Sequence, residues 1–247
     1  MSWDAAGAFV WHETDISPEV LGQEMRDNAF GWVAVFVQDG ANADPVEDGW
    51  IPRFRRASGL PVGGWGVLRT RPAEEARLAS SIIERDGLDF FIANAEAEYS
   101  YSGLDGPDPA RFRRSKEFVA TFRELQPSLP AAVSTYCRPD QHDINWSAWS
   151  SASFAYLPQA YVNDFGAAAA PAQCTRSASA YFPVAAVHPT IGMYPGVARS
   201  LSAERYARLL AQAGTIGFSV YLAETRMTPD SWDALGAAIR GRGIAKS

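Results

Sequence analysis

The sequence lacks the marks of several protein classes. No apolar run among its 247 residues is long enough to cross a bilayer, which argues against a membrane-spanning helix. The two cysteines, Cys137 and Cys174, fit neither a metal-site spacing nor a disulfide framework, so we expect two reduced thiols. The glycine-rich fingerprints of nucleotide-binding folds and the Gly-x-Ser-x-Gly elbow of serine hydrolases are also missing.

Positive charge is scarce as well. The 22 Lys and Arg against 28 Asp and Glu give a net charge of -6, which disfavours nucleic acid as a partner. A membrane partner is not expected either. The N-terminal stretch has no basic segment followed by an apolar one, and therefore no signal-peptide pattern. We expect a cytoplasmic protein, or a virion or extracellular protein that forms part of a larger polypeptide or assembly.

What the sequence does contain is an alternation of short β-like runs and helix-like stretches along its whole length. Eight such units in 247 residues predict an α/β fold, a single (β/α)8 TIM barrel that spans residues 1–247 as one domain. Pro158 falls inside the sixth expected strand, where it removes a ladder hydrogen bond. The expected strands cover residues 8–11, 32–37, 61–67, 88–97, 131–136, 154–162, 182–187 and 215–222.

Catalytic groups of such barrels lie at the C-terminal ends of the strands. In the fourth expected strand, Asn94, Glu96 and Glu98 alternate with alanines, and period-two alternation sends all three to one face. Two carboxylates side by side in a barrel lumen raise the pKa of one of them, which suits a general acid. The alternative is that the chain has already left the barrel here, so that both glutamates are solvated.

Polar residues also share one face in the sixth expected strand, where Gln159, Tyr161 and Asn163 alternate with apolar residues. Such groups can orient a carboxylate or bind the hydroxyl and amide groups of a substrate. The alternative is a hydrogen-bonded lumen that has no part in catalysis.

The segment Asn94-x-Glu96-x-Glu98-Tyr99 resembles the strand-four signature of glycoside hydrolase family 18, in which acids two residues apart lead to a proton-donating glutamate followed by an aromatic. Gln159-x-Tyr161-x-Asn163 is similar to the sixth-strand segment of that family, where a tyrosine assists the N-acetyl group of the substrate. Family 25 lysozymes, also barrels, likewise have an acidic pair at the end of strand four. Two short segments carry the likeness.

By this resemblance Glu98 is the proton donor and Glu96 polarises the substrate amide. The sequence departs from the signature, because Phe91 and Asn94 stand where the family has aspartates and Glu96 is longer than the third one. A conventional two-carboxylate mechanism, with Glu96 or Glu224 as the second group, stays open.

The sequence therefore predicts a glycoside hydrolase-like barrel that acts on a polysaccharide or oligosaccharide, such as a cell-wall or capsular glycan, without a cofactor or metal. The expected catalytic residues are Glu98, Glu96 and Glu224. The expected substrate-binding residues are Asn94, Gln159, Tyr161, Asn163, Trp11, His12, Tyr99 and His188, with Trp32 and Trp65 as further stacking candidates.

Two other interpretations compete with this one. The same barrel without catalytic activity would be a carbohydrate-binding or structural module of a larger assembly such as a phage tail. A metal site formed by His12, Glu13, His188 and Glu224 is a weaker alternative, because no His-x-His or His-Glu-x-x-His spacing occurs.

Overall fold

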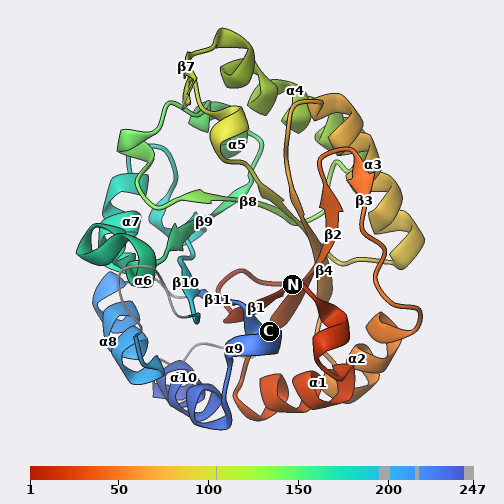
Figure 1. Cartoon of the computed structure of the whole chain (residues 1–247), viewed down its shortest axis with the longest axis vertical. Coiled ribbons are helices and arrows are strands. Elements are labelled where there is room, and N and C mark those ends of the chain that lie inside the picture. Colours follow the sequence, from red (N-terminus) through yellow and green to blue (C-terminus); the bar gives the residue numbers. More distant parts are fainter. Residues whose placement is uncertain (104, 195–200, 215–216, 242–247) are drawn as a thin grey trace.

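The computed structural model describes residues 1–103, 105–194, 201–214 and 217–241, and in this part of the chain eight parallel strands close into a barrel surrounded by helices (Figure 1). The first strand pairs with both the second and the last, which closes the ring. The predicted TIM barrel is therefore confirmed. The barrel strands are β1 (Gly7–Val10), β2 (Trp32–Asp39), β4 (Val62–Val67), β5 (Phe91–Asn94), β8 (Ala131–Tyr136), β9 (Ala155–Ala160), β10 (Thr190–Gly192) and β11 (Ser219–Tyr221).

The helices begin where the sequence carries start signals. Ser17 and Ser202 each accept a hydrogen bond from the backbone N–H three residues ahead, as N-cap side chains do. Several helices have proline at their first position, where its missing N–H costs nothing. The helices are α1 (Pro18–Asp27), α2 (Trp50–Ser58), α3 (Pro72–Asp86), α4 (Pro109–Leu125), α5 (Trp146–Ser151), α6 (Val162–Phe165), α7 (Pro171–Ala178), α8 (Ala203–Ala213), α9 (Ala223–Arg226) and α10 (Pro229–Gly241).

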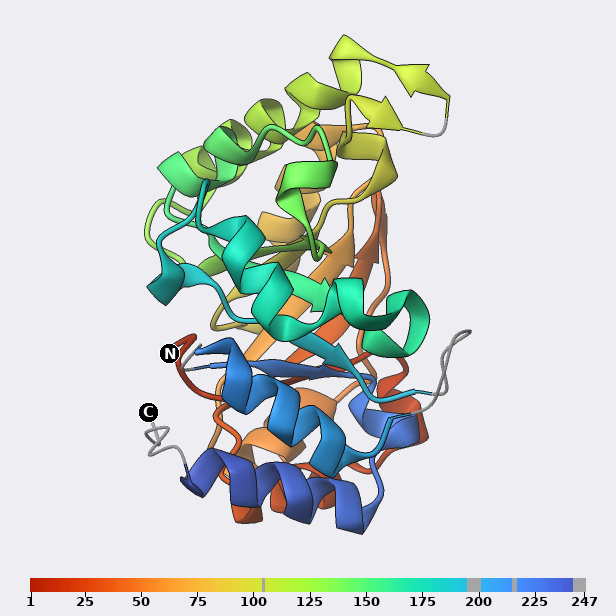
Figure 2. The ribbon, with the colours of Figure 1, turned by 90° about the vertical axis from the view of Figure 1, so that its left-hand side faces the viewer.

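Shorter elements lie in the loops. Figure 2 shows the small hairpin of β6 (Ser102–Gly103) and β7 (Gly106–Pro107) at the edge of the molecule, beside the start of α4. β3 (Asn42–Ala43) pairs antiparallel with the end of β2. Single 3-10 turns are η1 (Glu13–Asp15), η2 (Ala97–Tyr99), η3 (Pro139–Gln141), η4 (Gly166–Ala169) and η5 (Val184–Ala186).

Two apolar layers hold the barrel together. Outward-facing strand residues such as Val33, Val35 and Phe91 pack against the helices, while inward-facing ones fill the lumen. In the lumen, Trp32 and Phe90 pack edge to face with ring centroids 5.4 Å apart. The packing leaves no room for a larger residue than glycine at position 7, because a Cβ there would lie 2.0 Å from the Trp32 indole.

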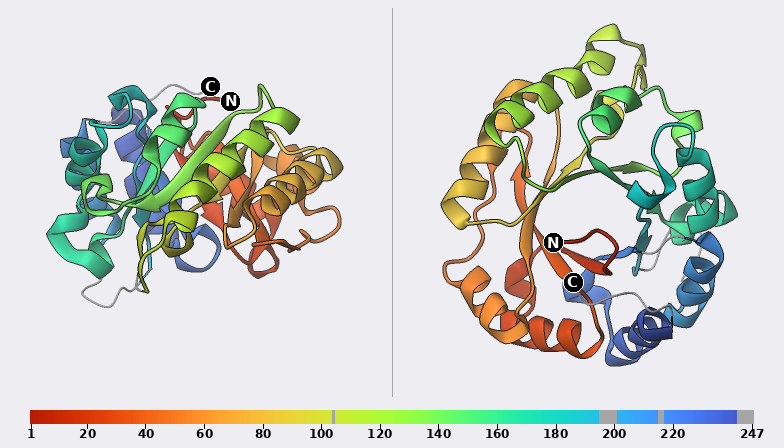
Figure 3. Two further views of the ribbon diagram at one scale, coloured as in Figure 1. Left: turned by 90° about the horizontal axis from the view of Figure 1, so that it is seen from above. Right: turned by 180° about the vertical axis from the view of Figure 1, so that it is seen from behind.

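The N-terminal segment closes one end of this lumen. The Trp3 ring packs edge to face on Trp32 and Phe90, with centroids 5.5 and 5.3 Å away. Figure 3 shows the N-terminus in the ring of strands when the barrel is viewed along its axis, and at one end when it is viewed from above. Since parallel strands all begin at the same end, the opposite end carries the C-terminal strand ends.

The seventh strand is not where the sequence predicted it. Residues 182–187 contain the 3-10 turn η5, and β10 begins only at Thr190. The pairs Tyr156–Val187 and Gln159–Thr190 share one register, which sets Pro158 opposite Pro189. Neither proline has an N–H to donate, so the ladder between β9 and β10 is interrupted at this point. Pro158 itself remains inside β9, as predicted.

The eighth strand is shorter than predicted. β11 covers Ser219–Tyr221, and Thr215 and Ile216 of the predicted strand lie outside the described residues. Throughout the described ranges, no helix is both long and apolar enough to span a membrane.

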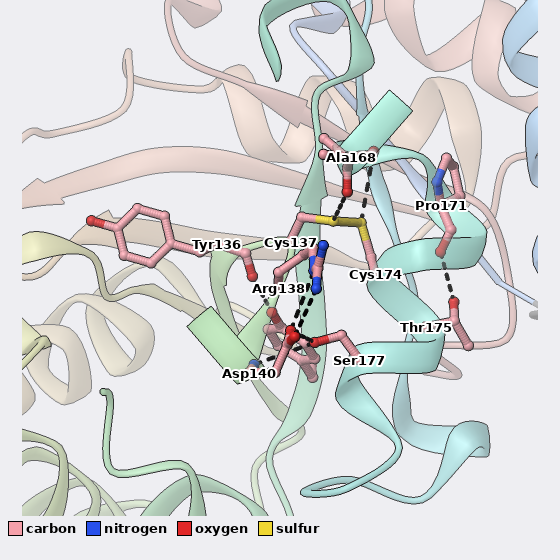
Figure 4. The surroundings of a disulfide bond; sticks show 11 residues. Tyr136, Cys137, Arg138, Asp140, Ala168, Pro171, Cys174, Thr175 and Ser177 are labelled. Carbon is pink, nitrogen blue, oxygen red and sulfur yellow. Dashed lines mark hydrogen bonds and ion pairs between the residues drawn. A yellow bond between two sulfur atoms is a disulfide. The ribbon is translucent and has the colours of Figure 1, made fainter. Parts of the chain in front are cut away.

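The prediction of two reduced thiols is wrong. Cys137, which directly follows β8, forms a disulfide with Cys174 of α7, and their Cα atoms are 4.7 Å apart (Figure 4). This distance lies within the range that a disulfide requires. Their separation of 37 positions in the sequence gave no hint of it, because the path of the chain from β8 through β9 to α7 brings the two cysteines together.

Candidate active site

A cavity of about 370 Å³ opens at the C-terminal ends of the strands. This is the end at which TIM barrels carry their active sites, and the volume falls in the range of small-molecule sites. Its lining combines aromatic rings with a few polar side chains. The lining residues are Phe9, Trp11, Trp65, Val67, Arg69, Asn94, Glu96, Ser134, Gln159, Tyr161, Asp164, Phe165, Tyr194 and Tyr221.

Glu96 is the predicted catalytic residue that reaches this cavity. Asn94 at the end of β5 and Glu96 two residues later both face inward, in phase with the lumen residue Ile92. The Glu96 Oε1 atom accepts hydrogen bonds from Nε2 of Gln159 at 2.7 Å and Nδ2 of Asn94 at 3.1 Å. Gln159 also donates to Asn94 Oδ1 at 3.1 Å. Two amides, from the strands on either side of β8, thus fix one carboxylate at the mouth.

Glu98 lies elsewhere, which corrects its assignment to the lumen beside Glu96. The strand ends at Asn94, and the 3-10 turn η2 then breaks the period-two alternation on which the assignment rested. The Glu98 carboxylate accepts a hydrogen bond from Nη1 of Arg69 at 3.1 Å, and Nε of the same guanidinium donates to Asp39 at 2.7 Å. Glu98 therefore belongs to an ion-pair group at the rim of the barrel.

Tyr99 is a structural residue, and its assignment to the substrate is corrected too. Its side chain is fully buried, and its hydroxyl donates to Oε2 of the buried Glu75 at 3.0 Å. Oε1 of Glu75 accepts from the backbone N–H groups of Arg69 and Arg71 at 3.1 and 2.9 Å. The two residues together hold the loop that carries Arg69 to the cavity.

Three tyrosines form one wall of the cavity. The Tyr161 ring stacks on Tyr221 with centroids 5.8 Å apart, and Tyr194 meets Tyr161 edge to face at 5.7 Å. Burial raises the pKa of Tyr161, and the Glu96 carboxylate adds to the rise. Burial and the Glu224 and Glu96 carboxylates raise the pKa of Tyr221 in the same way. Their hydroxyls therefore stay protonated and able to donate hydrogen bonds to a substrate.

Trp11 directly follows β1 and lies beside Tyr221 of this wall. It is 39% exposed, and its ring lies 6.0 Å from Trp65 and 6.3 Å from Tyr221, centroid to centroid. A half-exposed indole over a cavity is suited to stack on the apolar face of a sugar. His12 follows on the exposed surface and stacks on Trp11 with centroids 5.6 Å apart.

Glu224 does not line the cavity but fixes the loop that carries Trp11. Its Oε1 atom accepts from the backbone N–H groups of Trp11 and His12 at 3.0 and 3.2 Å. Its Oε2 atom is buried with no hydrogen-bond partner among the residues that the structure describes. Burial raises the pKa of Glu224, although these backbone hydrogen bonds act against the rise. The geometry thus gives Glu224 a positioning role.

Asn163 is not available to a substrate. Its side chain is fully buried, and its amide donates to the carbonyl of Tyr194 at 2.9 Å while its Oδ1 atom accepts from the Tyr206 hydroxyl at 2.9 Å. The chain leaves β9 at Ala160 and enters α6, so the alternation that placed Asn163 beside Tyr161 no longer applies. Asn163 instead anchors Tyr194.

His188 and Trp32 lie away from the cavity. His188 precedes β10 instead of following a strand, so it is at the N-terminal end of the barrel, where Gly217 and the backbone of Trp3 and Asp4 surround it. Burial lowers the pKa of His188 to about 4, so the ring is neutral. Trp32 is fully buried within the lumen. Both substrate-binding assignments are therefore corrected.

Several lining residues escaped sequence analysis, among them Tyr194, Arg69 and Asp164. Tyr194 follows β10 and was missed because that strand was placed several residues too early. Arg69 lies in the loop after β4 and Asp164 lies in α6 after β9, and no pattern marked either position. Asp164 accepts a hydrogen bond from the Tyr194 hydroxyl at 2.6 Å. The position of Asp164 directly after Tyr161-x-Asn163 was the signal that could have found it.

Within the described ranges, no three His, Cys, Asp or Glu residues come together as metal ligands. His12 and Glu224 of the alternative metal site meet through the backbone of His12, and His188 is at the other end of the barrel.

The chain resembles known proteins in structure. No family model matches the sequence, and no curated protein does. Solved structures do match. A family 18 chitinase from Pseudoalteromonas aurantia aligns with a TM-score of 0.70 and 12% identity over 95% of this chain and 99% of that one. A family 18 N-acetylglucosaminidase from Paenibacillus barengoltzii gives 0.69 and 10%, again over 95% and 99%.

A protein described as a chitinase-like agglutinin, from Robinia pseudoacacia, also matches, with a TM-score of 0.64 and 7% identity over 94% of this chain and 99% of that one. Matches at sequence identities this low show a shared fold and do not show a shared activity. The predicted likeness to family 18 is thus confirmed for the fold, whereas the likeness to family 25 lysozymes stays a prediction. The chain has the (β/α)8 barrel fold of the glycoside hydrolase family 18 chitinases.

Proposed function

We propose that this protein is a glycoside hydrolase that cleaves a polysaccharide or oligosaccharide in the cavity around Glu96. The observation that carries the proposal is the placement of Glu96 at a C-terminal strand end, fixed by Asn94 and Gln159 and facing the Tyr161 wall. A positioned carboxyl group between aromatic rings is what protonation of a glycosidic oxygen requires.

The geometry favours Glu96 over Glu98 as the general acid. In the family 18 signature the proton donor ends a run of inward-facing residues, and here that run ends at Glu96, since the chain turns away in η2. Asn94 then stands where the signature has the preceding acid. Its amide holds Glu96 and can also orient a substrate carbonyl.

The reaction also needs a nucleophile or base on the opposite side of the sugar from Glu96. Asp164 lines the same cavity and supports a two-carboxylate mechanism. Tyr161 supports the other route, in which the N-acetyl group of the substrate is the nucleophile and the tyrosine hydroxyl donates to it, as the family resemblance implies. A structural neighbour from Cycas revoluta was solved in complex with (GlcNAc)4, which makes an N-acetylglucosamine oligomer the first substrate to try.

The disulfide bears on where the protein works. Disulfides persist in oxidising surroundings and are rare in the cytosol, so Cys137–Cys174 favours the extracellular alternative over the cytoplasmic one.

A matched pair of variants tests the proposal. The protein, its Glu96→Gln variant and its Glu98→Gln variant are incubated with chitin oligosaccharides, peptidoglycan and capsular glycans, and the release of reducing ends is measured. Loss of general acid catalysis is expected to slow Glu96→Gln by about 10²–10⁴-fold, whereas Glu98→Gln keeps most of its activity. Loss of activity in Glu98→Gln with an active Glu96→Gln would contradict the assignment.

A second candidate function is carbohydrate binding without cleavage. Phe91 in place of an acid and the position of Glu98 outside the cavity favour it, and a chitinase-like agglutinin shares the fold. Calorimetry with (GlcNAc)4 separates the two: binding by the unaltered protein without any release of reducing ends would leave this candidate alone. The comparisons give no support to a role in a phage tail.

A further inference from the structure

A second pocket lies beside the catalytic cavity. Its volume is about 260 Å³, and it is lined by Tyr136, Cys137, Arg138, Gln141, His142, Gln159, Phe165, Ala168 and Ala169. Gln159 and Phe165 line both cavities, so the two spaces adjoin. Gln159 is also the residue that donates to Glu96, which places the second pocket directly behind the support of the proposed acid.

The walls of this pocket are mainly apolar. Tyr136 and His142 stack face to face with ring centroids 3.8 Å apart, and the disulfided Cys137 joins the opposite wall with Ala168 and Ala169. Figure 4 shows Cys137, Ala168 and Tyr136 around the disulfide.

Charge contributes little to this pocket. The Arg138 guanidinium is paired with Asp140 at 2.7 Å, which offsets its charge. Burial lowers the pKa of His142, which keeps its ring uncharged at neutral pH. An uncharged, apolar group therefore suits the pocket better than an ionised one or a sugar ring with many hydroxyls.

The chemistry of the proposed reaction decides which part of a substrate reaches the pocket. A general acid protonates the oxygen that links the sugar to its leaving group, so the leaving group lies on the acid's side of the sugar. The second pocket begins at Gln159, the residue that donates to Glu96, so it adjoins the cavity at the proposed acid. Its volume falls below the ~300 Å³ lower end of complete ligand sites, which suits one end of a longer ligand.

We infer that this pocket binds an apolar aglycone, an alkyl or aryl group attached to the sugar that is cleaved at Glu96. The inference rests on the proposed function and adds its substrate class: a glycoside whose leaving group is at least partly apolar. Phe165, whose side chain is 65% exposed, would cover the group from the solvent side.

The test uses alkyl β-glycosides of N,N′-diacetylchitobiose with methyl, butyl and hexyl chains. Each methylene that enters the pocket is expected to tighten binding about fourfold, until the pocket is full. Ala168→Trp places an indole in the pocket and is expected to bring the ratio of hexyl to methyl affinity towards one. Ala167→Trp, at the neighbouring exposed position outside the lining, is the matched control and should keep the chain-length dependence.

Binding is measured by calorimetry and hydrolysis by alcohol release. A failure of the pocket proposal then gives a different result from a failure of the hydrolase proposal. Hydrolysis without chain-length dependence, or dependence that survives in Ala168→Trp, overturns the aglycone pocket alone. Chain-length-dependent binding that Ala168→Trp abolishes, without hydrolysis, supports the pocket and overturns the hydrolase. No binding of any of the three glycosides overturns the aglycone pocket, and the release of reducing ends from the glycan panel then decides on the hydrolase.

Discussion

Removal of the disulfide should destabilise the protein by a predictable amount. The bond joins residues separated by 37 positions, and closing a loop of this length lowers the entropy of the unfolded chain by an amount worth about 4 kcal/mol at 25 °C. For a chain of 247 residues, 1 kcal/mol corresponds to about 2–4 °C in Tm. The Cys137→Ser/Cys174→Ser double variant is therefore expected to melt about 8–16 °C below the unaltered protein.

The assay is thermal unfolding followed by circular dichroism, with and without a phosphine reductant. The double variant leaves no lone thiol, so it separates the cross-link from thiol chemistry. Reductant should lower the Tm of the unaltered protein towards that of the variant and leave the variant unchanged. Equal melting temperatures of the two proteins, or an equal effect of reductant on both, would refute the reasoning.

Three further predictions concern stability. Burial raises the pKa of Glu224 above 4.5, so the stability that protonated Glu224 contributes is complete below pH 4.5. This stability is lost as the pH rises through the higher pKa of the folded state. Glu224→Gln should remove this pH dependence, which urea unfolding between acid and neutral pH measures. Gly7→Ala forces a methyl group into the Trp32 ring and should lower the free energy of unfolding by about 1–3 kcal/mol or more in the same assay. Tyr99→Phe leaves an oxygen of the buried Glu75 without its donor, and calorimetric unfolding should show a loss of about 1–3 kcal/mol.

The sequence was sufficient for the fold because the barrel repeats one local pattern. Each β/α unit carries its own signals, such as the Ser17-Pro18 start of α1, and these do not depend on distant contacts. The prediction of the seventh strand failed because its position depends on distant contacts. Whether residues 182–187 or 190–192 form the strand depends on their register against β9, where Pro158 faces Pro189.

The site was predictable as far as the strands extend. Asn94 and Gln159 belong to β5 and β9, and Tyr161 directly follows β9, so the alternation still directs all three to the cavity. Glu98 and Asn163 do not, because the chain has by then entered a turn or a helix. The disulfide and the support of Trp11 by Glu224 join segments far apart in sequence, and no local pattern encodes such contacts.

The replacement of an acid of the family signature by Asn94 has a physical explanation in this lumen. Asn94 donates to Glu96 and accepts from Gln159 at the same time, whereas an aspartate at this position could only accept. It would also bring a second negative charge to Glu96, at a cost that grows with burial. With Asn94, the Glu96 carboxylate is held by two neutral amide donors. The changed signature is therefore compatible with one-acid chemistry at Glu96, and the departure at Asn94 does not by itself argue for a disabled site.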